Sequence, residues 1–108
     1  MDLGLTDRSV LVTGGSGGIG RAIALAYAAE GARVTLTYHE NRGAAAAVVT
    51  EVERRGGTAA ATPMDLADLA SIEHAIEAAA ARHDGLDVLV AANTNITGTY
   101  LPVAGGTD

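Results

Sequence analysis

The sequence contains no cysteine, phenylalanine or tryptophan, and only two prolines among 108 residues. Without cysteine, a disulfide framework and a thiolate metal site are both excluded. Hydrophobic residues still make up 48% of the chain, and much of that share is alanine. A core must therefore be built from Val, Ile, Leu and Ala. The length suffices for one small domain, and a disordered chain is not expected.

Positive charge and long hydrophobic runs are scarce as well. The formal net charge is −6, which argues against a nucleic-acid or anionic-membrane surface. No apolar run approaches the ~20 residues of a membrane span. The start of the chain, Met1–Gly4, has neither a basic region nor a long apolar stretch, so no secretory signal is expected. We therefore expect a soluble, cytoplasmic protein with no nucleic-acid or membrane partner.

A short apolar run followed by a glycine-rich turn is the most informative stretch. Val10–Val12 is typical of a strand buried on both faces, and five of the seven residues 14–20 are glycine. Such a turn accepts positive φ and lets a ligand approach bare backbone. A helix that begins near Gly18 would direct its free N–H groups and the positive end of its dipole into the turn. This arrangement favours an anion.

The spacing of this turn is Thr13-Gly14-x-x-x-Gly18-Ile19-Gly20 rather than Gly-x-Gly-x-x-Gly. A strand before it and a helix after it are the context that supports a dinucleotide site. The anion would then be the pyrophosphate of a dinucleotide. A flexible turn is the alternative interpretation.

The rest of the chain alternates strand-like and helix-like segments. We expect strands at 9–13, 33–38, 58–62 and 87–92, and helices at 18–30, 42–55 and 69–83. Ile19, Ile23, Ala26 and Tyr27 form an apolar stripe on the first helix, and Asp68 can cap the third. Strands that alternate with helices of this length indicate βαβ units. Right-handed crossovers then predict an α/β, Rossmann-type doubly wound parallel sheet with strand order 3-2-1-4.

These features resemble the short-chain dehydrogenase/reductases, in particular members similar to 3-oxoacyl-(acyl carrier protein) reductase. The resemblance covers about residues 5–100, but only the first half of the family's fold. It implies a dinucleotide-binding half-domain at 1–92, with an incomplete sheet, and a loop at 93–108 that leads to a missing C-terminal half. The residues that carry it, besides the glycine turn, are Gly31-Ala32-Arg33-Val34, Gly56-Gly57, Asp65-Leu66 and Leu86-Asp87-Val88-Leu89-Val90.

The strand order reverses between the first and fourth strands, and ligands bind there, beyond the carboxyl ends. Ser16 and the amides of the turn would hold phosphate, although Ser16 could be only a turn residue. The resemblance implies that Asp65 meets an adenine ring; an ordinary entry residue of the third helix is the alternative. The full set of expected cofactor-binding residues is Thr13, Gly14, Ser16, Gly17, Gly18, Ile19, Gly20, Tyr38, His39, Arg42, Asp65, Leu66, Ala92 and Asn93.

The end of the second strand bears on the choice between NAD and NADP. An NAD enzyme usually places Asp or Glu there for the ribose 2′-OH, whereas this chain has Thr37-Tyr38-His39, with Glu40 close by. Arg42, and His39 if protonated, could face a 2′-phosphate. We therefore expect NADP, with NAD as the alternative. Gly17 stands where many NADP-preferring members of the family carry a basic residue.

The segment after the fourth strand departs from the family. The family usually has Asn-Asn-Ala-Gly, and this chain has Ala91-Ala92-Asn93-Thr94. Thr94 replaces a glycine where the backbone packs close to the cofactor. Asn93 or Asn95 could substitute in part, or be an ordinary loop residue.

The residues that the family uses for proton transfer are not found. The family uses a Ser and a Tyr-x-x-x-Lys, but no lysine follows Gly85, and Tyr100 is followed four residues later by Ala104. We therefore assign no catalytic residue. We also assign no metal site, because His39, His74 and His83 do not form a metal-binding constellation.

Three hypotheses follow. The favoured one is an N-terminal piece of a reductase that acts on a small carbonyl or alcohol. The second is a non-catalytic dinucleotide-binding module. The third is a half-reductase completed by another chain or by self-association, because the last strand would leave an exposed sheet edge and an open apolar patch. A homo-oligomer or a complementing chain is accordingly an expected partner.

Overall fold

The computed structural model describes residues 4–14, 17–83 and 85–92. All four described strands are parallel and form one sheet in the order β3-β2-β1-β4. The predicted fold class and strand order are confirmed, and each element ends within one residue of its predicted bounds. The elements are β1 (Ser9–Thr13), α1 (Gly18–Ala29), β2 (Arg33–Tyr38), α2 (Arg42–Arg54), β3 (Thr58–Pro63), α3 (Leu69–His83) and β4 (Val88–Ala91).

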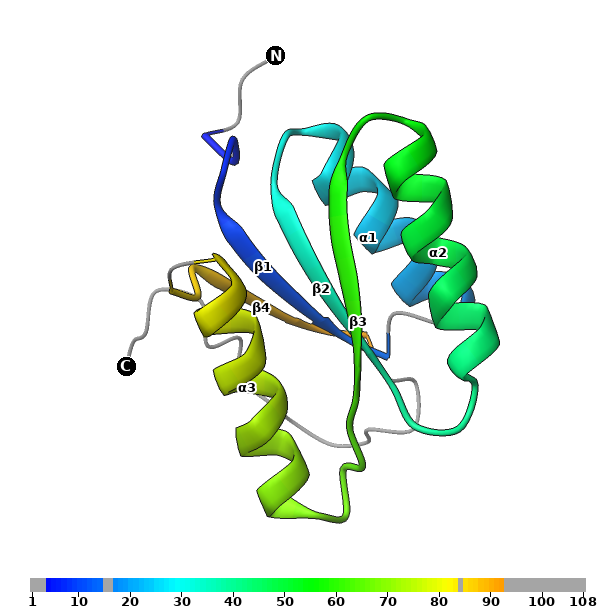
Figure 1. Ribbon diagram of the computed structural model, residues 1–108, viewed down its shortest axis with the longest axis vertical. Coiled ribbons are helices and arrows are strands. Elements are labelled where there is room, and N and C mark those ends of the chain that lie inside the picture. The colour runs from blue at the N-terminus through cyan, green and yellow to red at the C-terminus, as the bar shows by residue number, and fades with distance from the viewer. Residues whose placement is uncertain (1–3, 15–16, 84, 93–108) are drawn as a thin grey trace.

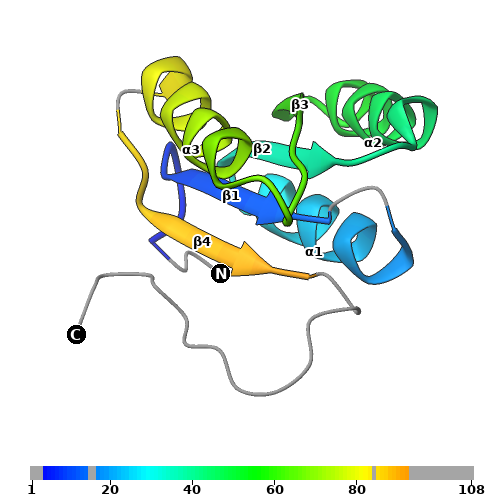
Figure 2. The same ribbon diagram turned by 90° about the horizontal axis from the view of Figure 1, so that it is seen from below.

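Helices cover both faces of the sheet. In Figure 1, α1 and α2 lie to the right of the sheet and α3 lies to the left. Figure 2 shows the strands between these two layers. Right-handed crossovers produce this arrangement when the chain returns past β1 after β3. The carboxyl ends of the strands consequently meet along one edge of the sheet.

The two faces of the sheet differ in polarity. Val10, Val34 and Leu36 point to the face under α1 and α2 and belong to its buried apolar cluster, since side chains alternate between the two faces along each strand. On the face under α3, Leu11 is paired in register with Thr35 on one side and with Leu89 on the other. The main apolar core therefore lies under α1 and α2, and consists of Val10, Val12, Ala24, Ala28, Ala32, Val34, Leu36, Ala45, Val48, Val52 and Ala59.

Helix α1 packs through its smallest residues, and the predicted stripe of Ile19, Ile23, Ala26 and Tyr27 is wrong in part. Ile19 is 57% exposed and Ala26 is also exposed, while Ile23 and Tyr27 are half-buried. The buried residues are instead Gly20, Ala24 and Ala28. Small side chains let a helix backbone approach a sheet closely, and this close approach outweighs the burial of the larger residues.

The residues at the helix ends agree with the capping rules that apply to the sequence. After α1, Gly31 has a φ of +90°, its N–H donates to the Ala28 carbonyl, and the Ala32 N–H donates to the Tyr27 carbonyl. This is the Schellman arrangement, which needs a left-handed residue and therefore favours glycine. At the start of α3, Asp68 Oδ1 accepts the Ala70 N–H at 3.1 Å, so the predicted cap is confirmed. No helix among the described residues is long and apolar enough to cross a bilayer.

Candidate functional site

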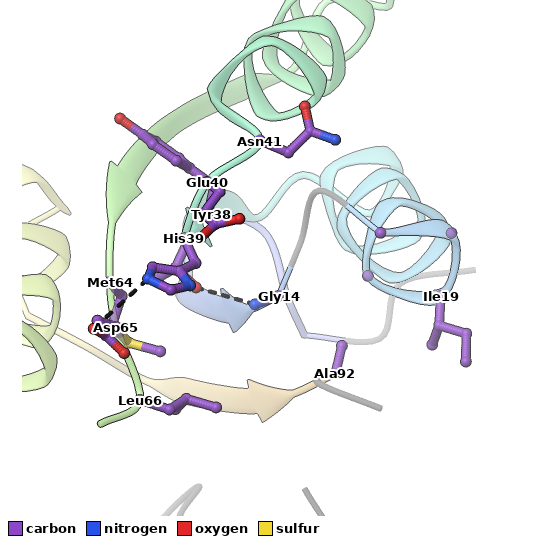
Figure 3. Close-up of a pocket in the computed structure, with 14 residues that line it drawn as sticks. Gly14, Ile19, Tyr38, His39, Glu40, Asn41, Met64, Asp65, Leu66 and Ala92 are labelled. Carbon is purple, nitrogen blue, oxygen red and sulfur yellow. Dashed lines mark hydrogen bonds and ion pairs between the residues drawn. The ribbon is translucent and has the colours of Figure 1, made fainter. Parts of the chain in front are cut away.

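A cleft of about 560 Å³ opens where the strands end (Figure 3). Clefts of this size are typical of sites for small molecules and cofactors. Five segments that are distant in the sequence form its walls. They are Gly14 after β1, Gly17–Gly20 at the start of α1, Thr37–Asn41 at the end of β2, Met64–Leu66 after β3, and Ala92 after β4.

One wall of the cleft is the N-terminus of α1. Gly17 occupies the N-cap position and makes no side-chain capping hydrogen bond, and the first turn of α1 contains no acidic residue. A Cβ atom added at Gly18 would meet no atom within 4 Å. The helix therefore presents backbone N–H groups and a positive dipole end to open space, an arrangement suited to an anion.

A hydrogen bond ties the glycine turn to the neighbouring strand. Gly14 has a φ of +74°, and its N–H donates to Thr37 Oγ1 at 3.0 Å. The Gly17 N–H donates in turn to the Gly14 carbonyl at 3.3 Å. Thr37 is buried, with 1% exposure, so it fixes the point where the chain leaves β1 and turns towards α1.

Asp65 lines the cleft in the segment after β3, and hydrogen bonds to neighbouring residues hold it in place. Its Oδ1 accepts the Ala67 N–H at 2.9 Å, and its own N–H donates to Ser71 Oγ at 2.8 Å. The second carboxylate oxygen, Oδ2, lies 3.6 Å from Nε2 of His39. Figure 3 shows the imidazole and the carboxylate facing one another across this gap. The pair joins the segment after β2 to the segment after β3.

Most of the predicted cofactor-binding residues come together in this cleft. Thr13 is not among the lining residues. It is 8% exposed, and its hydroxyl lies 3.5 Å from the Val90 carbonyl oxygen. Arg42 lines a different hollow, together with Val49 and others on α2. Ser16 and Asn93 lie outside the described residues. The predicted residues that line the cleft are Gly14, Gly17, Gly18, Ile19, Gly20, Tyr38, His39, Asp65, Leu66 and Ala92.

Four lining residues were missing from the predicted set. Glu40 and Asn41 extend the wall after β2, and Thr37 also lines the cleft. Met64 enters because its N–H donates to the Tyr38 carbonyl at 2.8 Å, which prolongs the pairing of β2 with β3. Thr37 and Glu40 were noted in the sequence as part of the end of the second strand, whereas only their positions beside predicted residues pointed to Asn41 and Met64. In the described part of the chain, no group of three or more His, Asp or Glu residues is placed to hold a metal ion.

Comparison with known proteins agrees with this geometry. The family model of the short chain dehydrogenases matches residues 8–101. The chain belongs to the short chain dehydrogenase family. The resemblance drawn from the glycine turn is thereby confirmed.

Individual relatives show how much of the length of a family member this chain covers. An L-rhamnose 1-dehydrogenase (NAD(P)(+)) of Azotobacter vinelandii is 44% identical over 89 residues, which are 80% of this chain and 35% of that protein. A 3-oxoacyl-(acyl-carrier-protein) reductase of Synechocystis sp. is 41% identical over 86 residues, 80% of this chain and 35% of the reductase. This short chain dehydrogenase sequence therefore spans about a third of the length of these relatives.

A solved structure of the family has the same arrangement of elements. A short chain dehydrogenase of Burkholderia cenocepacia, in complex with NADP, superposes with a TM-score of 0.76 at 44% identity. The superposition covers 79% of this chain and 35% of that one. The likeness supports the Rossmann-type fold described above.

Proposed function

We propose that this chain is the dinucleotide-binding portion of an NAD(P)-dependent oxidoreductase, one that interconverts a small carbonyl and an alcohol by hydride transfer when complete. One observation carries the proposal. The uncapped N-terminus of α1 opens into a cleft at the point where the strand order reverses, which is the usual ligand position in such sheets.

The residues present fit a dinucleotide. The backbone from Gly17 to Gly20 can accept a diphosphate, because Gly18 leaves room for close approach. Asp65 and Leu66 line the cleft on the far side of β2, where an adenosine group would lie. A bound nicotinamide dinucleotide would supply or accept the hydride. The role of the described residues is to bind and orient it, and we assign no catalytic residue in this chain.

NADP is the cofactor we favour. Support comes from the end of β2, where Tyr38 and His39 line the cleft in place of the carboxylate typical of NAD enzymes. The Burkholderia structure, a complex with NADP, is consistent with this choice. NAD remains the alternative, because Glu40 and Asp65 also line the cleft. A cytoplasmic location and association with a second chain remain predictions.

The test is a pair of matched glycine substitutions. Gly18 and Gly43 both lie in the first turn of a helix, and a Cβ at either would meet no atom within 4 Å. Only Gly18 lines the cleft. We expect Gly18→Val to weaken NADPH and NADH binding by at least about tenfold, the equivalent of ~1.4 kcal/mol. Gly43→Val should leave both affinities within about twofold of the unsubstituted chain.

Isothermal titration calorimetry of the 108-residue chain measures these affinities, and thermal unfolding shows whether either variant is misfolded. Unchanged binding by Gly18→Val, or no binding of either cofactor by the unsubstituted chain, contradicts the proposal. An assay of NADPH oxidation with a ketone separates binding from catalysis. We expect no turnover by this chain alone, and clear turnover would show that the assignment of no catalytic residue is wrong.

A further inference from the structure

The face of the sheet under α3 carries the buried polar side chains of the described part of the chain. They are Ser9, Thr13, Thr35, Thr37 and Thr62. Each lies an odd number of residues along its strand from a member of the apolar cluster under α1 and α2, so alternation places it on the opposite face. On α3 itself, Ala75 and Ala79 are buried, while Ile72 and Ile76 are half-buried. This contact covers little apolar area, so the position of α3 depends more on local hydrogen bonds.

The first turn of α3 carries a serine whose hydroxyl is bonded to the segment before the helix. Ser71 Oγ accepts the Asp65 N–H at 2.8 Å. Its O–H can donate to either of two carbonyl oxygens, those of Asp65 and Asp68, which both lie 2.9 Å away. A hydroxyl can make both kinds of bond because it is a donor and an acceptor at once. One side chain of α3 therefore contacts both backbone groups of Asp65.

The segment that Ser71 contacts is a wall of the cleft. Asp65 and Leu66 line the cleft, whereas Ser71 is not part of its lining; Figure 3 shows the first two side chains at its edge. Leu66 is 45% exposed, so burial does little to fix it. The segment is fixed at its start by the hydrogen bond from the Met64 N–H to the Tyr38 carbonyl. Ser71 fixes its other side to a helix.

Resting on the proposed function, we propose that Ser71 is a positioning residue for the dinucleotide. It does not touch the ligand, but it keeps Asp65 and Leu66 in the arrangement that binds it. Without the hydroxyl, the Asp65 N–H and carbonyl lose their link to α3, and the wall is in the binding arrangement for only part of the time. The apparent dissociation constant rises as this fraction falls. Bound dinucleotide conversely stabilises the first turn of α3, because coupling is reciprocal.

Three serine substitutions in the 108-residue chain test the proposal. Ser71→Ala removes the hydroxyl and Ser71→Thr retains it. Ser9→Ala is the matched control, because Ser9 also lies on the α3 face and is 1% exposed, but its hydroxyl has no partner within the described part of the chain. Calorimetric titration measures the dissociation constants of NADPH and NADH, and urea unfolding shows that each variant is folded under the conditions used.

We expect Ser71→Ala to raise both dissociation constants about fivefold, which corresponds to a binding-competent fraction of about one fifth. Ser71→Thr and Ser9→Ala should remain within about twofold of the unsubstituted chain. A lower overall stability does not by itself change the affinity while nearly all molecules are folded, so a merely structural role predicts no change. Equal loss in Ser71→Ala and Ser71→Thr would exclude the hydroxyl as the cause.

Unchanged affinity in Ser71→Ala refutes the positioning role and leaves the proposed function standing. If the unsubstituted chain binds neither cofactor, both are refuted.

Hydrogen exchange followed by NMR gives an independent measurement that needs no variant. The N–H groups of Ser71 and Ile72 both donate to the Asp68 carbonyl, and neither residue lines the cleft. Saturating NADPH should slow their exchange at least about fivefold, since the bound state holds the wall and the first turn of α3 together. The Gly56 N–H, which donates to the Glu53 carbonyl at the far end of α2, is the control and should change less than about twofold. Equal changes at Ile72 and Gly56 would contradict the coupling, as would the same slowing at Ile72 in Ser71→Ala.

Discussion

The side-chain hydroxyl of Thr37 accepts a 3.0 Å hydrogen bond from the backbone N–H of Gly14, and so joins the end of β2 to the turn after β1. Thr37→Val keeps the shape of the side chain but leaves this part-buried N–H without its acceptor. We expect it to lower the free energy of unfolding by about 1–2 kcal/mol. It should also weaken dinucleotide binding, because the glycine turn loses its anchor. Urea unfolding and calorimetric titration measure the two effects.

The same strand offers a matched control. Thr35 lies two residues earlier, on the same face of β2, and is fully buried, but its hydroxyl has no hydrogen-bond partner within the described part of the chain. Thr35→Val should therefore be neutral or stabilising, because it removes an unsatisfied buried polar group. Thr37→Ser, which retains a hydroxyl, should recover part of the loss. Equal destabilisation by both valine substitutions would show that the hydrogen bond to Gly14 is not the cause.

The order of the elements could be predicted because local rules and tertiary packing agree there. The run Val10–Val12 is strand-like by composition and fully buried in the structure. Gly31 ends α1 with a φ of +90°. The face of α1 could not be predicted, because the sequence offers two stripes. The stripe of larger residues suggested Ile19, whereas the close approach of helix and sheet selected Ala24 and Ala28.

The site was predictable at the level of segments but not of contacts. The reversal of strand order predicts which loops converge, and ten of the expected residues do line the cleft. The meeting of His39 with Asp65 depends on the register of β2 and β3, in which Tyr38 pairs with Pro63, and no spacing in the sequence reveals this register. Arg42 was expected beside them, yet the first turn of α2 places it along a different hollow.

Gly57 shows a close contact between α2 and the start of β3. A Cβ at this position would lie 2.9 Å from Val52 Cγ1 and 3.5 Å from the Ala28 Cβ, and Val52 is 1% exposed. Gly57→Ala should therefore cost about 1–3 kcal/mol of stability through overpacking. Gly43→Ala, in open space on α2, should be neutral or add up to about 1 kcal/mol from helix propensity. Chemical denaturation compares the two, and equal stabilities would contradict the predicted clash.

Glu51 on α2 provides a prediction about pH. Its carboxylate accepts hydrogen bonds from Arg55 Nε at 2.7 Å and from Arg54 Nη1 at 3.1 Å. The hydrogen bond from Arg55, followed by the charges of Arg54 and Arg55, lowers the pKa of Glu51 below its ordinary value, although burial acts in the opposite direction. A carboxyl group with a lowered pKa in the folded state stabilises the protein when it is ionised.

This stabilisation should be complete above the unfolded pKa of ~4.3 and should be lost as the pH falls through the lower pKa of the folded state. Glu51→Gln should be less stable than the unsubstituted chain at neutral pH, and the two should converge in acid. Glu53→Gln, at an exposed position on the same helix, is the control and should remain close to the unsubstituted chain throughout. Urea unfolding from about pH 3 to pH 7 measures the difference. A difference between Glu51→Gln and the unsubstituted chain that does not change with pH would mean that the arginine contacts are not linked to the ionisation of Glu51.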